Sequence, residues 1–264
     1  MQFAVGLANT GSYSDPLTAI RVAAAAEKAG WDGFFVWDHL AFVWGPPAAD
    51  PWIVLAAIAA TVPRLRIGTA VTPVARRRPH VLAQTVATLD VLSGGRVVFG
   101  AGLGGSATEF ARFGEPADPS VRAEMLDEGL TVLRALWSGD EVRHAGSHYT
   151  VDGVRLAPVP LQPRLPIWIG GNRPASLRRA ARWDGWIADS ADPTGLTSSP
   201  DDVARNIQTI GRGDDFDVAV LGRSDDIDPS AYRNVGASWW LESIDDRRGD
   251  AERMLALVRA GPPR

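Results

Sequence analysis

The pair Asp38-His39 is the strongest chemical feature of the sequence. It follows the apolar run Gly33 to Trp37, which has the composition of a buried strand. A histidine at the exit of a strand can donate to a bound ligand or move a proton near neutral pH. The adjacent aspartate can fix a dipole or meet a ring nitrogen of a bound molecule. The alternative is structural, with His39 only capping the loop that follows.

Two glycine-rich segments are candidates for a binding site. Gly100 to Gly105 formally matches G-x-G-x-x-G, but a dinucleotide site would place this motif after the first strand and open a helix with it. We therefore reject a nicotinamide site and keep the simpler implication, that a flat ligand can approach the backbone. The segment Gly170 to Pro174 leaves a strand and begins a helix, so free N–H groups beside Arg173 favour phosphate binding. An ordinary tight turn is the equal alternative.

The other polar residues carry weaker signals. Arg76 to Arg78 is interpreted as a solvated charge run, of which one member could reach a phosphate. His144 and His148 are four residues apart, but Gly146 between them indicates a loop, so we predict no metal site. Three acidic residues could supply the carboxylate pair of a glycoside hydrolase: Glu109, Asp189 and Glu242.

Composition excludes several classes of protein. The 264 residues are 45% hydrophobic and carry a net charge of −4, which argues against nucleic acid as a partner. The absence of cysteine excludes disulfides and thiolate chemistry. The start of the chain does not resemble a signal peptide, and no apolar run approaches the roughly 20 residues of a membrane span. We expect a cytoplasmic protein with no membrane partner. The 10 tryptophans suggest an aromatic ligand or a large apolar cleft.

The stretch from Arg66 to Gly105 sets the architecture. An apolar run, a helix with Leu82, Val86 and Leu89 on one face, and a second apolar run form a parallel strand–helix–strand unit. Similar units recur, and the predicted strands are 3–7, 33–37, 66–71, 96–99, 166–169, 185–188, 218–221 and 238–241. We interpret 106–119 as a polar loop and 139–164 as irregular or hairpin-like. The pattern predicts one (β/α)8 TIM barrel over residues 1–264, because two doubly wound lobes would need a linker that is absent.

A barrel brings residues that are distant in the chain to one rim. The carboxyl ends of parallel strands lie at the same end of the barrel, where ligands bind. The residues expected there are Ala8, Asp38, His39, Thr72, Gly102, Gly170, Ser190 and Glu242.

Four motifs together resemble the bacterial luciferase-like superfamily. They are Asp38-His39, the sequence GTAVTP at 68–73, RVVFGAGLG at 96–104 with Glu109-Phe110 and Phe113-Gly114 behind it, and PIWIGGN at 166–172. That superfamily comprises flavin-dependent monooxygenases and deazaflavin-dependent oxidoreductases. The similarity extends well from Met1 to about Ser190 and weakly beyond.

The resemblance implies a barrel with reduced FMN or coenzyme F420 across its rim. It places a non-prolyl cis peptide at Ala70-Val71 against the ring, catalysis at His39 with Asp38, and substrate at Trp44 and Glu109. The cofactor residues that it implies are Ala70, Val71, Thr72, Gly102, Leu103, Gly104, Gly170, Gly171, Asn172 and Ser190. It also implies a homodimer packed through early helices, a role that the apolar helix Trp52 to Ala60 suits.

The chain departs from this family in two respects. The insertion usual near the seventh strand is reduced to the stub Asp225 to Val235, and Gly104 to Thr108 lacks the Glu-x-x-Asn pattern of the sugar-phosphate dehydrogenases. We therefore do not predict a sugar phosphate, the substrate of those dehydrogenases, as the substrate of this protein. We expect a monooxygenase that uses reduced FMN on a small organic molecule, with F420-dependent hydride transfer as the alternative. A non-catalytic flavin-binding or partner-binding barrel and a hydrolase using Asp189 and Glu242 also stay open.

Overall fold

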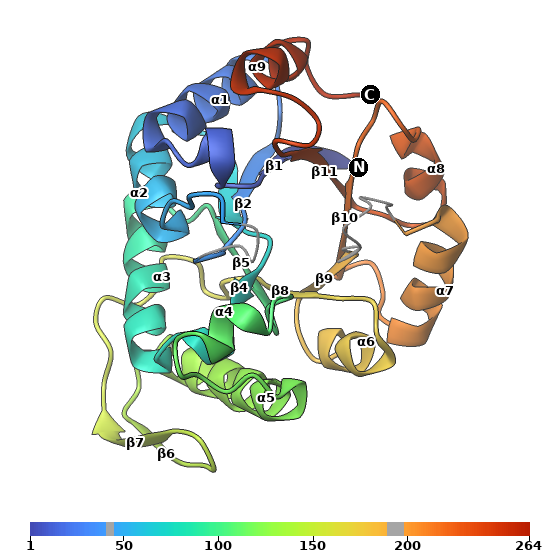
Figure 1. Cartoon of the computed structure of the whole chain (residues 1–264). Helices are drawn as coiled ribbons and strands as arrows, with labels where there is room; N and C mark the ends of the chain where they lie inside the picture. The colour runs from blue at the N-terminus through green and yellow to red at the C-terminus, as the bar shows by residue number, and fades with distance from the viewer. Residues whose placement is uncertain (41–44, 189–197) are drawn as a thin grey trace.

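The protein is built around a closed barrel of parallel strands (Figure 1). The structure is a computed structural model that describes residues 1–40, 45–188 and 198–264. The barrel strands are β1 (Gln2–Leu7), β2 (Gly33–Val36), β3 (Arg66–Thr69), β4 (Thr72–Pro73), β5 (Val97–Gly102), β8 (Ile167–Gly170), β9 (Gly185–Ala188), β10 (Asp217–Gly222) and β11 (Trp239–Ile244). β3 and β4 share one position in the barrel, and pairing of β3 with β5 closes the ring. The predicted TIM barrel is confirmed.

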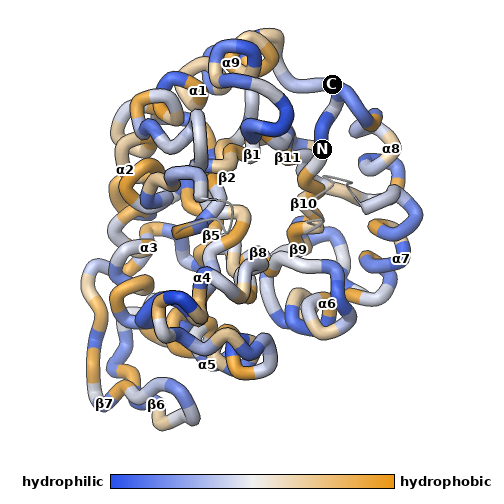
Figure 2. Tube along the Cα trace, in the orientation of Figure 1, coloured by the Kyte–Doolittle hydropathy of each residue, from blue (hydrophilic) through white to orange (hydrophobic). Residues whose placement is uncertain are grey.

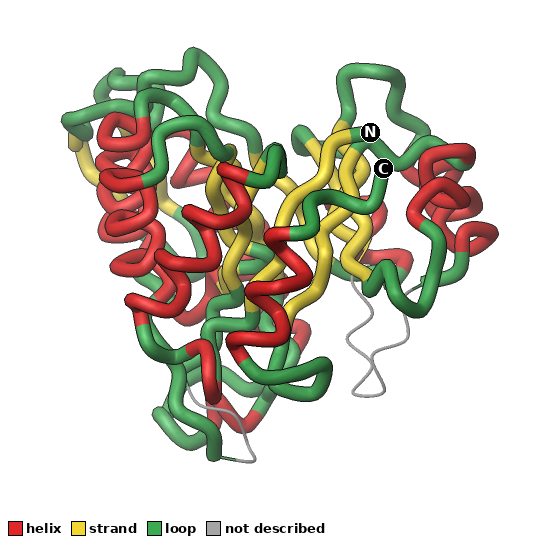
Figure 3. The backbone as a smooth tube through the Cα atoms, turned by 90° about the horizontal axis from the view of Figure 1, so that it is seen from above, coloured by secondary structure: helices red, strands yellow, loops and turns green. Residues whose placement is uncertain are grey.

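Helices surround the strands, as the views along and across the barrel show (Figures 1 and 3). They are α1 (Pro16–Lys28), α2 (Pro51–Thr61), α3 (Pro79–Ser93), α4 (Thr108–Ala111), α5 (Pro119–Leu136), α6 (Pro174–Ala180), α7 (Pro200–Ile210), α8 (Pro229–Asn234) and α9 (Ala251–Arg259), with the 3-10 turns η1 (Gly11–Tyr13) and η2 (Val74–Arg76). In the described part of the chain, no helix has the length and apolarity that a membrane crossing needs.

Aspartate–proline pairs define where four of the helices begin. Asp15, Asp50, Asp118 and Asp228 each accept hydrogen bonds from backbone N–H groups in the first turn, and each is followed by proline at the first helical position. Proline lacks the N–H group that would be unpaired there, and its fixed φ suits the helix. These local signals explain why the helix starts could be predicted.

Apolar side chains pack in two layers, inside the barrel and between strands and helices; hydrophobic segments follow the strands in Figure 2. Inside, Phe35 stacks on Trp168 with ring centroids 5.4 Å apart, and Trp239 packs edge-on to Trp168. Trp240 points outward to the other layer, as the alternation of a strand predicts.

The expectation that many tryptophans mark a ligand cleft is wrong for most of them. Among the described residues, seven are buried, at Trp31, Trp52, Trp137, Trp168, Trp186, Trp239 and Trp240. Large aromatic side chains fill the volume inside and around an eight-stranded barrel, so they stabilise the fold through apolar burial.

Asp217 lies at the amino-terminal end of the barrel, opposite the rim. Its carboxylate accepts hydrogen bonds from the indoles of Trp168 and Trp239, each at 3.2 Å. Burial raises the pKa of Asp217, although hydrogen bonds from Ser238 and the two indoles oppose this shift. All of these hydrogen-bond donors are neutral side chains. Asp217 lies at the end of the barrel where TIM-barrel enzymes do not bind ligands, so we assign it a role in packing.

Two segments differ from simple strand–helix repeats. The stretch predicted as irregular or hairpin-like contains the antiparallel pair β6 (Val142–Ala145) and β7 (Thr150–Val154), which lies outside α5 in Figure 1. The stretch 106–119, predicted as a polar loop, contains the short helix α4. The single turn of α4 carries Glu109 and Phe110, and both side chains are buried.

Candidate active site

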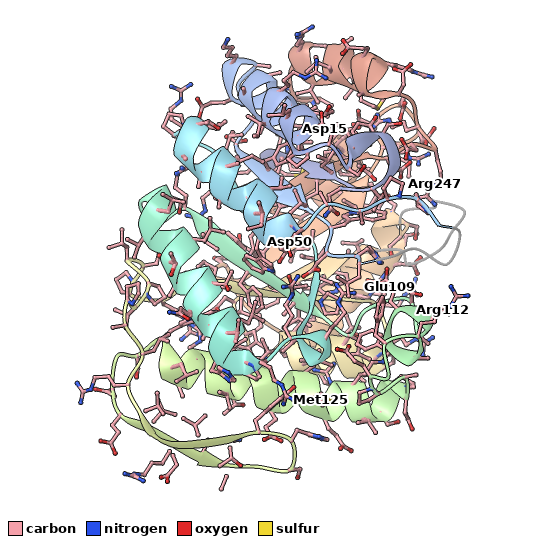
Figure 4. The ribbon with its side chains drawn as sticks, turned by 60° about the vertical axis from the view of Figure 1, so that its left-hand side comes forward. Asp15, Asp50, Glu109, Arg112, Met125 and Arg247 are labelled. Atoms are coloured by element: carbon pink, nitrogen blue, oxygen red, sulfur yellow. The ribbon has the colours of Figure 1, made fainter. Side chains whose placement is uncertain are left out.

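The rim of the barrel collects residues from several loops. Glu109, Arg112 and Arg247 lie at the same end of the molecule as Asp15 and Asp50, the caps of α1 and α2 (Figure 4). Helices antiparallel to the strands begin at this end, so it is the carboxyl end of the barrel. Two expected site residues, Trp44 and Ser190, lie outside the described residues.

The side chain of Val71 lies against both Gly102 and Gly170. The peptide bond between Ala70 and Val71 is cis, as the resemblance implied, and both side chains pack at the barrel interior. A Cβ on Gly102 would lie 2.5 Å from Val71 Cγ2, and one on Gly170 would lie 2.8 Å from Val71 Cγ1. Glycine is therefore needed at both positions because a Cβ would collide with the side chain of Val71. A ligand would constrain these positions only through its contact with Val71.

The loop after β5 is held by three neighbours. Gly104 has φ +84°, and a Cβ there would lie 2.9 Å from the ring of Phe110 and 3.1 Å from Pro73 Cβ. Arg122 on α5 donates to the carbonyls of Leu103 and Gly104, at 3.3 and 3.0 Å, and its guanidinium lies 4.4 Å from the centre of the Phe110 ring. Burial lowers the pKa of Arg122, while the charge of Asp118 opposes this. The backbone of this loop is thus fixed before any ligand binds.

Thr72 offers a polar group near the same loop. Its side chain is buried, and its hydroxyl has no hydrogen-bond partner among the described residues. A buried polar group without a partner loses the hydrogen bonds that it would make in water. Thr72 is therefore a residue whose hydroxyl can be satisfied by a bound molecule.

The segment after β8 differs from the predicted anion site. The N–H of Gly171 donates to the carbonyl of Ile187 at 3.2 Å, and the indole of Trp186 donates to the carbonyl of Gly171 at 2.9 Å. The N–H of Gly171 is therefore not free for phosphate, contrary to our expectation. Asn172 lies beyond it and donates to the hydroxyl of Ser198 at 2.8 Å.

His39 forms a pair with a carboxylate from another loop. Its Nδ1 lies 3.2 and 3.1 Å from the two carboxylate oxygens of Glu109. The His39 side chain is 22% exposed and Glu109 only 3%. A carboxylate can only accept, so Nδ1 carries the proton in this contact. The ring of Trp37 lies beside His39, with centroids 5.8 Å apart.

Arg76 joins this pair to Asp38. Its guanidinium donates to Glu109 Oε2 at 2.9 Å, to Asp38 Oδ1 at 2.6 Å and to the carbonyl of Asp38 at 2.7 Å. Arg77 donates to both carboxylate oxygens of Asp38, at 3.0 and 2.9 Å. The side chains of Arg76 and Asp38 are 3% and 1% exposed. The interpretation of Arg76 to Arg78 as a solvated charge run is thus wrong for Arg76, and Asp38 is engaged by arginines.

Sequence reasoning missed Arg76 and Arg122 as parts of the site. Arg76 had a usable signal, because η2 directly follows the strand end at Pro73 and must lie on the rim. Arg122 had none, since it is one polar residue in the first turns of a long amphipathic helix. We name the set His39, Glu109, Arg76, Asp38 and Arg77 the histidine network.

Glu242 belongs to a separate network at the same rim. It is fully buried and accepts from the indole of Trp240 at 2.7 Å and from the hydroxyl and N–H of Ser224, each at 3.0 Å. Arg248 lies 2.6 Å from its Oε1. These partners leave Glu242 unsuited to attack a substrate, which removes support for the hydrolase reading; its proposed partner Asp189 lies outside the described residues.

The two histidines considered for metal binding contact carboxylates instead. His144 Nε2 lies 3.0 Å from Glu128 Oε1, and His148 Nε2 lies 3.2 Å from Glu124 Oε2. The N–H groups of His148 and Tyr149 also donate to Glu128. These contacts attach the β6–β7 hairpin to α5.

Comparison with known proteins gives the same family as the motifs. The model of the luciferase-like monooxygenase family matches residues 1–225. An uncharacterized protein of Mycobacterium tuberculosis is 30% identical over 232 residues, 80% of each chain. An F420-dependent glucose-6-phosphate dehydrogenase of Microbacterium testaceum is 39% identical over 176 residues, which are 64% of this chain but only 51% of that protein.

The fold comparison agrees. A structure of an F420-dependent secondary alcohol dehydrogenase, in complex with an F420–acetone adduct, superposes with a TM-score of 0.77 and covers 98% of both chains at 20% identity. That identity supports the fold alone. The family match over residues 1–225, together with the sequence relatives, shows that the chain belongs to the luciferase-like monooxygenase family.

Proposed function

We propose that the protein is a luciferase-like oxidoreductase that binds a flavin-type cofactor across its rim and acts on a small organic molecule. The observation that carries the proposal is the meeting of two glycine segments at Val71, at the rim that also holds the histidine network. Gly102 and Gly170 are distant in the chain, yet both adjoin the same valine. They form a narrow apolar floor of the kind that suits a planar ring.

The residues present fit such a cofactor. Ala70, Val71, Gly102 and Gly170 supply the floor for the ring, and the Leu103–Gly104 loop supplies a rigid edge. Thr72 and Asn172 are the candidates for its polar contacts, with Ser190 from the undescribed segment. When bound, the cofactor would supply the redox chemistry: it would accept a hydride from a substrate that is oxidised and donate one to a substrate that is reduced.

His39 is the proposed catalytic residue. Its Nδ1–H is held by Glu109 and its side chain is 22% exposed, so we propose that the ring takes a proton from a substrate hydroxyl, or returns it in the reverse direction. The negative charge of Glu109 stabilises the ring once that proton arrives. Asp38 acts as a positioning residue through Arg76 and Arg77. Trp44 and Glu109 remain the proposed substrate-side residues.

We propose F420 as the cofactor and hydride transfer as the reaction, with reduced FMN and monooxygenation as the alternative. The relatives at 39% and 34% identity are F420-dependent dehydrogenases of glucose 6-phosphate and hydroxymycolic acid. The name of the matched family supports the monooxygenase alternative. The chain spans about half the length of those dehydrogenases, so their substrates are not transferred to it.

Anaerobic titration of the purified protein with each cofactor tests the proposal. We expect saturable binding of F420, measured by its fluorescence, and weaker binding of reduced FMN. The reverse order would favour the monooxygenase, whereas binding of neither would contradict both. Binding without turnover on alcohols, aldehydes and ketones would favour the non-catalytic barrel.

Thr72→Val sharpens the test because it removes a hydroxyl and keeps the side-chain shape. Loss of one hydrogen bond to the ligand should weaken binding about fivefold, which corresponds to about 1 kcal/mol. Thr61→Val, on the exposed end of α2, is the matched control. Equal affinities of the two variants would remove Thr72 from the site.

We further propose a homodimer through the outer face of α1, α2 and α3. α2 contains no charged residue, and its Ile53 is 68% exposed. The neighbouring helices add exposed apolar side chains: Leu17, Val81, Val91 and Leu92. Exposed apolar side chains on adjacent helices are typical of an interface. Ile53→Glu should convert the dimer to a monomer in sedimentation, and a monomeric wild-type protein would refute the proposal.

The cytoplasmic location remains a prediction from the sequence.

A further inference from the structure

The side chain of Arg122 lies where three segments of the rim meet. It projects from the first turns of α5 and is 5% exposed. Its Nη1 donates to the carbonyls of Leu103 and Gly104, at 3.3 and 3.0 Å. Its guanidinium carbon lies 4.4 Å from the centre of the Phe110 ring. One side chain of α5 therefore contacts both the loop after β5 and helix α4.

Arg122 differs from the other buried arginines in what it contacts. Arg179 and Arg248 are similarly buried, and each forms an ion pair with a carboxylate. Among the described residues no carboxylate forms an ion pair with Arg122, and the charge of Asp118 only opposes the lowering of its pKa by burial. Burying a guanidinium without a paired charge costs stability. A role in packing alone therefore explains this arginine poorly.

Helix α4 depends on tertiary contacts for its position. It spans Thr108–Ala111, and a helix of one turn has too few hydrogen bonds to be stable by itself. Phe110 anchors it, since its side chain is fully buried and a Cβ on Gly104 would lie 2.9 Å from its ring. The preceding residue, Glu109, carries the carboxylate whose oxygens lie 3.2 and 3.1 Å from His39 Nδ1. The position of that carboxylate therefore depends on how Phe110 is held.

We propose that Arg122 is a positioning residue that holds the loop after β5 and helix α4 together as one unit. Through Gly104 it fixes the edge against which the proposed cofactor lies. Through Phe110 it fixes Glu109 beside His39. The consequence for catalysis rests on the proposed function, whereas the coupling of loop and helix is a property of the protein alone.

Hydrogen exchange of the cofactor-free protein, measured by mass spectrometry, tests the coupling without relying on activity. The N–H groups of Glu109, Phe110 and Glu115 donate to carbonyls within the segment 106–115, so their exchange reports how often that segment opens. Arg122→Met removes the hydrogen-bond donors and keeps an apolar side chain. We expect exchange in 106–115 to become about tenfold faster, because hydrogen bonds from a charged group are lost. Exchange in β1 and β11 should stay unchanged.

Two variants control for burial and folding. Arg179, on α6, is 6% exposed and donates to both carboxylate oxygens of Asp127, which is also on α5. Arg179→Met should therefore lower the unfolding temperature without accelerating exchange in 106–115. Arg122→Lys keeps a cation that can reach the same carbonyls, so its exchange should lie between that of Arg122→Met and that of the wild type. It also serves if Arg122→Met does not fold.

In the loaded enzyme, Arg122→Met should both weaken cofactor binding and lower kcat, each about fivefold. The loss of the Thr72 hydroxyl, by contrast, should weaken binding alone. Because Arg122 acts on kcat through Glu109, its effect on kcat should disappear in a Glu109→Gln background. Additive losses of kcat in this double-mutant cycle would overturn the route through α4.

A merely structural role predicts a different result. Exchange would then rise evenly over the whole chain in Arg122→Met, as it does after a general loss of stability, and the inference would be overturned. Unchanged exchange in 106–115 would overturn it as well. If the wild-type protein binds no cofactor while the local effect in 106–115 is found, the proposed function fails and the coupling of loop and helix by Arg122 stands.

Discussion

Two ionic networks lie at the same rim of the barrel and use the same residue types. The histidine network joins loops after β2, β4 and β5, and the network around Glu242 joins the loops after β10 and β11. Both contain buried carboxylates paired with buried arginines. The first network includes the partly exposed ring of His39, whereas the carboxylate at the centre of the second, Glu242, is fully buried.

The comparison teaches how to separate a catalytic cluster from a structural one. Arg248 contacts Glu242, the carbonyl of Ser243 and the carboxylate of Asp225, and its side chain is 3% exposed. His39 contacts Glu109 through Nδ1, and its side chain is partly exposed. A network can act on a substrate only where a titratable group reaches the surface. Burial and charge pairing alone do not make that distinction.

The largest effect is expected at the exposed end of the histidine network. His39→Ala should lower kcat by about 10²- to 10⁴-fold, since it removes the group that exchanges the proton. Cofactor affinity should stay near that of the wild type, because the floor around Val71 is untouched. His80→Ala, at the exposed start of α3, is the matched control. An equal loss of turnover and affinity in His39→Ala would contradict the assigned role.

In the network around Glu242 we expect a mutation to lower the stability of the fold instead of the turnover. Arg248→Met leaves Glu242 buried without its cation, which should cost about 3–5 kcal/mol in urea unfolding. Arg205→Met, which removes an exposed arginine paired with Asp202, should cost about 1 kcal/mol or less. Turnover per folded molecule should be unchanged in both. A drop in turnover without destabilisation in Arg248→Met would place the second network in the active site.

Two neighbouring glycines allow a finer test of the rim. Gly104→Ala should cost about 1–2 kcal/mol, since a left-handed backbone disfavours a Cβ and this one would meet Phe110 and Pro73. Gly105→Ala should be nearly neutral, because no atom lies within 4 Å of the added Cβ. Thermal unfolding measures the difference, and cofactor titration shows whether the loop has moved. Equal behaviour of the two variants would mean that this loop is not rigid.

The smallest effect concerns acid stability. Burial would raise the pKa of Asp245, but the hydrogen bond from Arg247 and the charges of Arg247 and Arg223 outweigh it and hold the pKa below its ordinary value. The unfolded chain therefore binds the proton first as pH falls, and the stability that Asp245 contributes above pH 4 is lost below it. The slope is at most about 1.4 kcal/mol per pH unit. Urea unfolding between pH 5 and 3 should be less pH-dependent in Asp245→Asn; unchanged pH dependence would remove Asp245 from this account.

The sequence predicted the fold better than the site. Aspartate–proline starts, glycine stops and apolar periodicity are local, so they placed the barrel strands and most helices within a few residues. The short helix α4 was missed because one helical turn has no periodic signal. The glycines were recognised as important, yet their first role, making room for Val71, depends on strands that are far apart in the chain.

The sequence by itself determined the parallel barrel, the rim on which the strands end, the absence of cysteine chemistry and the presence of His39 at that rim. Only the tertiary structure decided which charges meet there. Glu109 is 70 residues from His39, and Arg76 is 38 residues from Asp38, and nothing local specifies either pair. The physical reason is that periodicity and capping act within a few residues, whereas electrostatic pairing depends on the distances that the closed barrel sets.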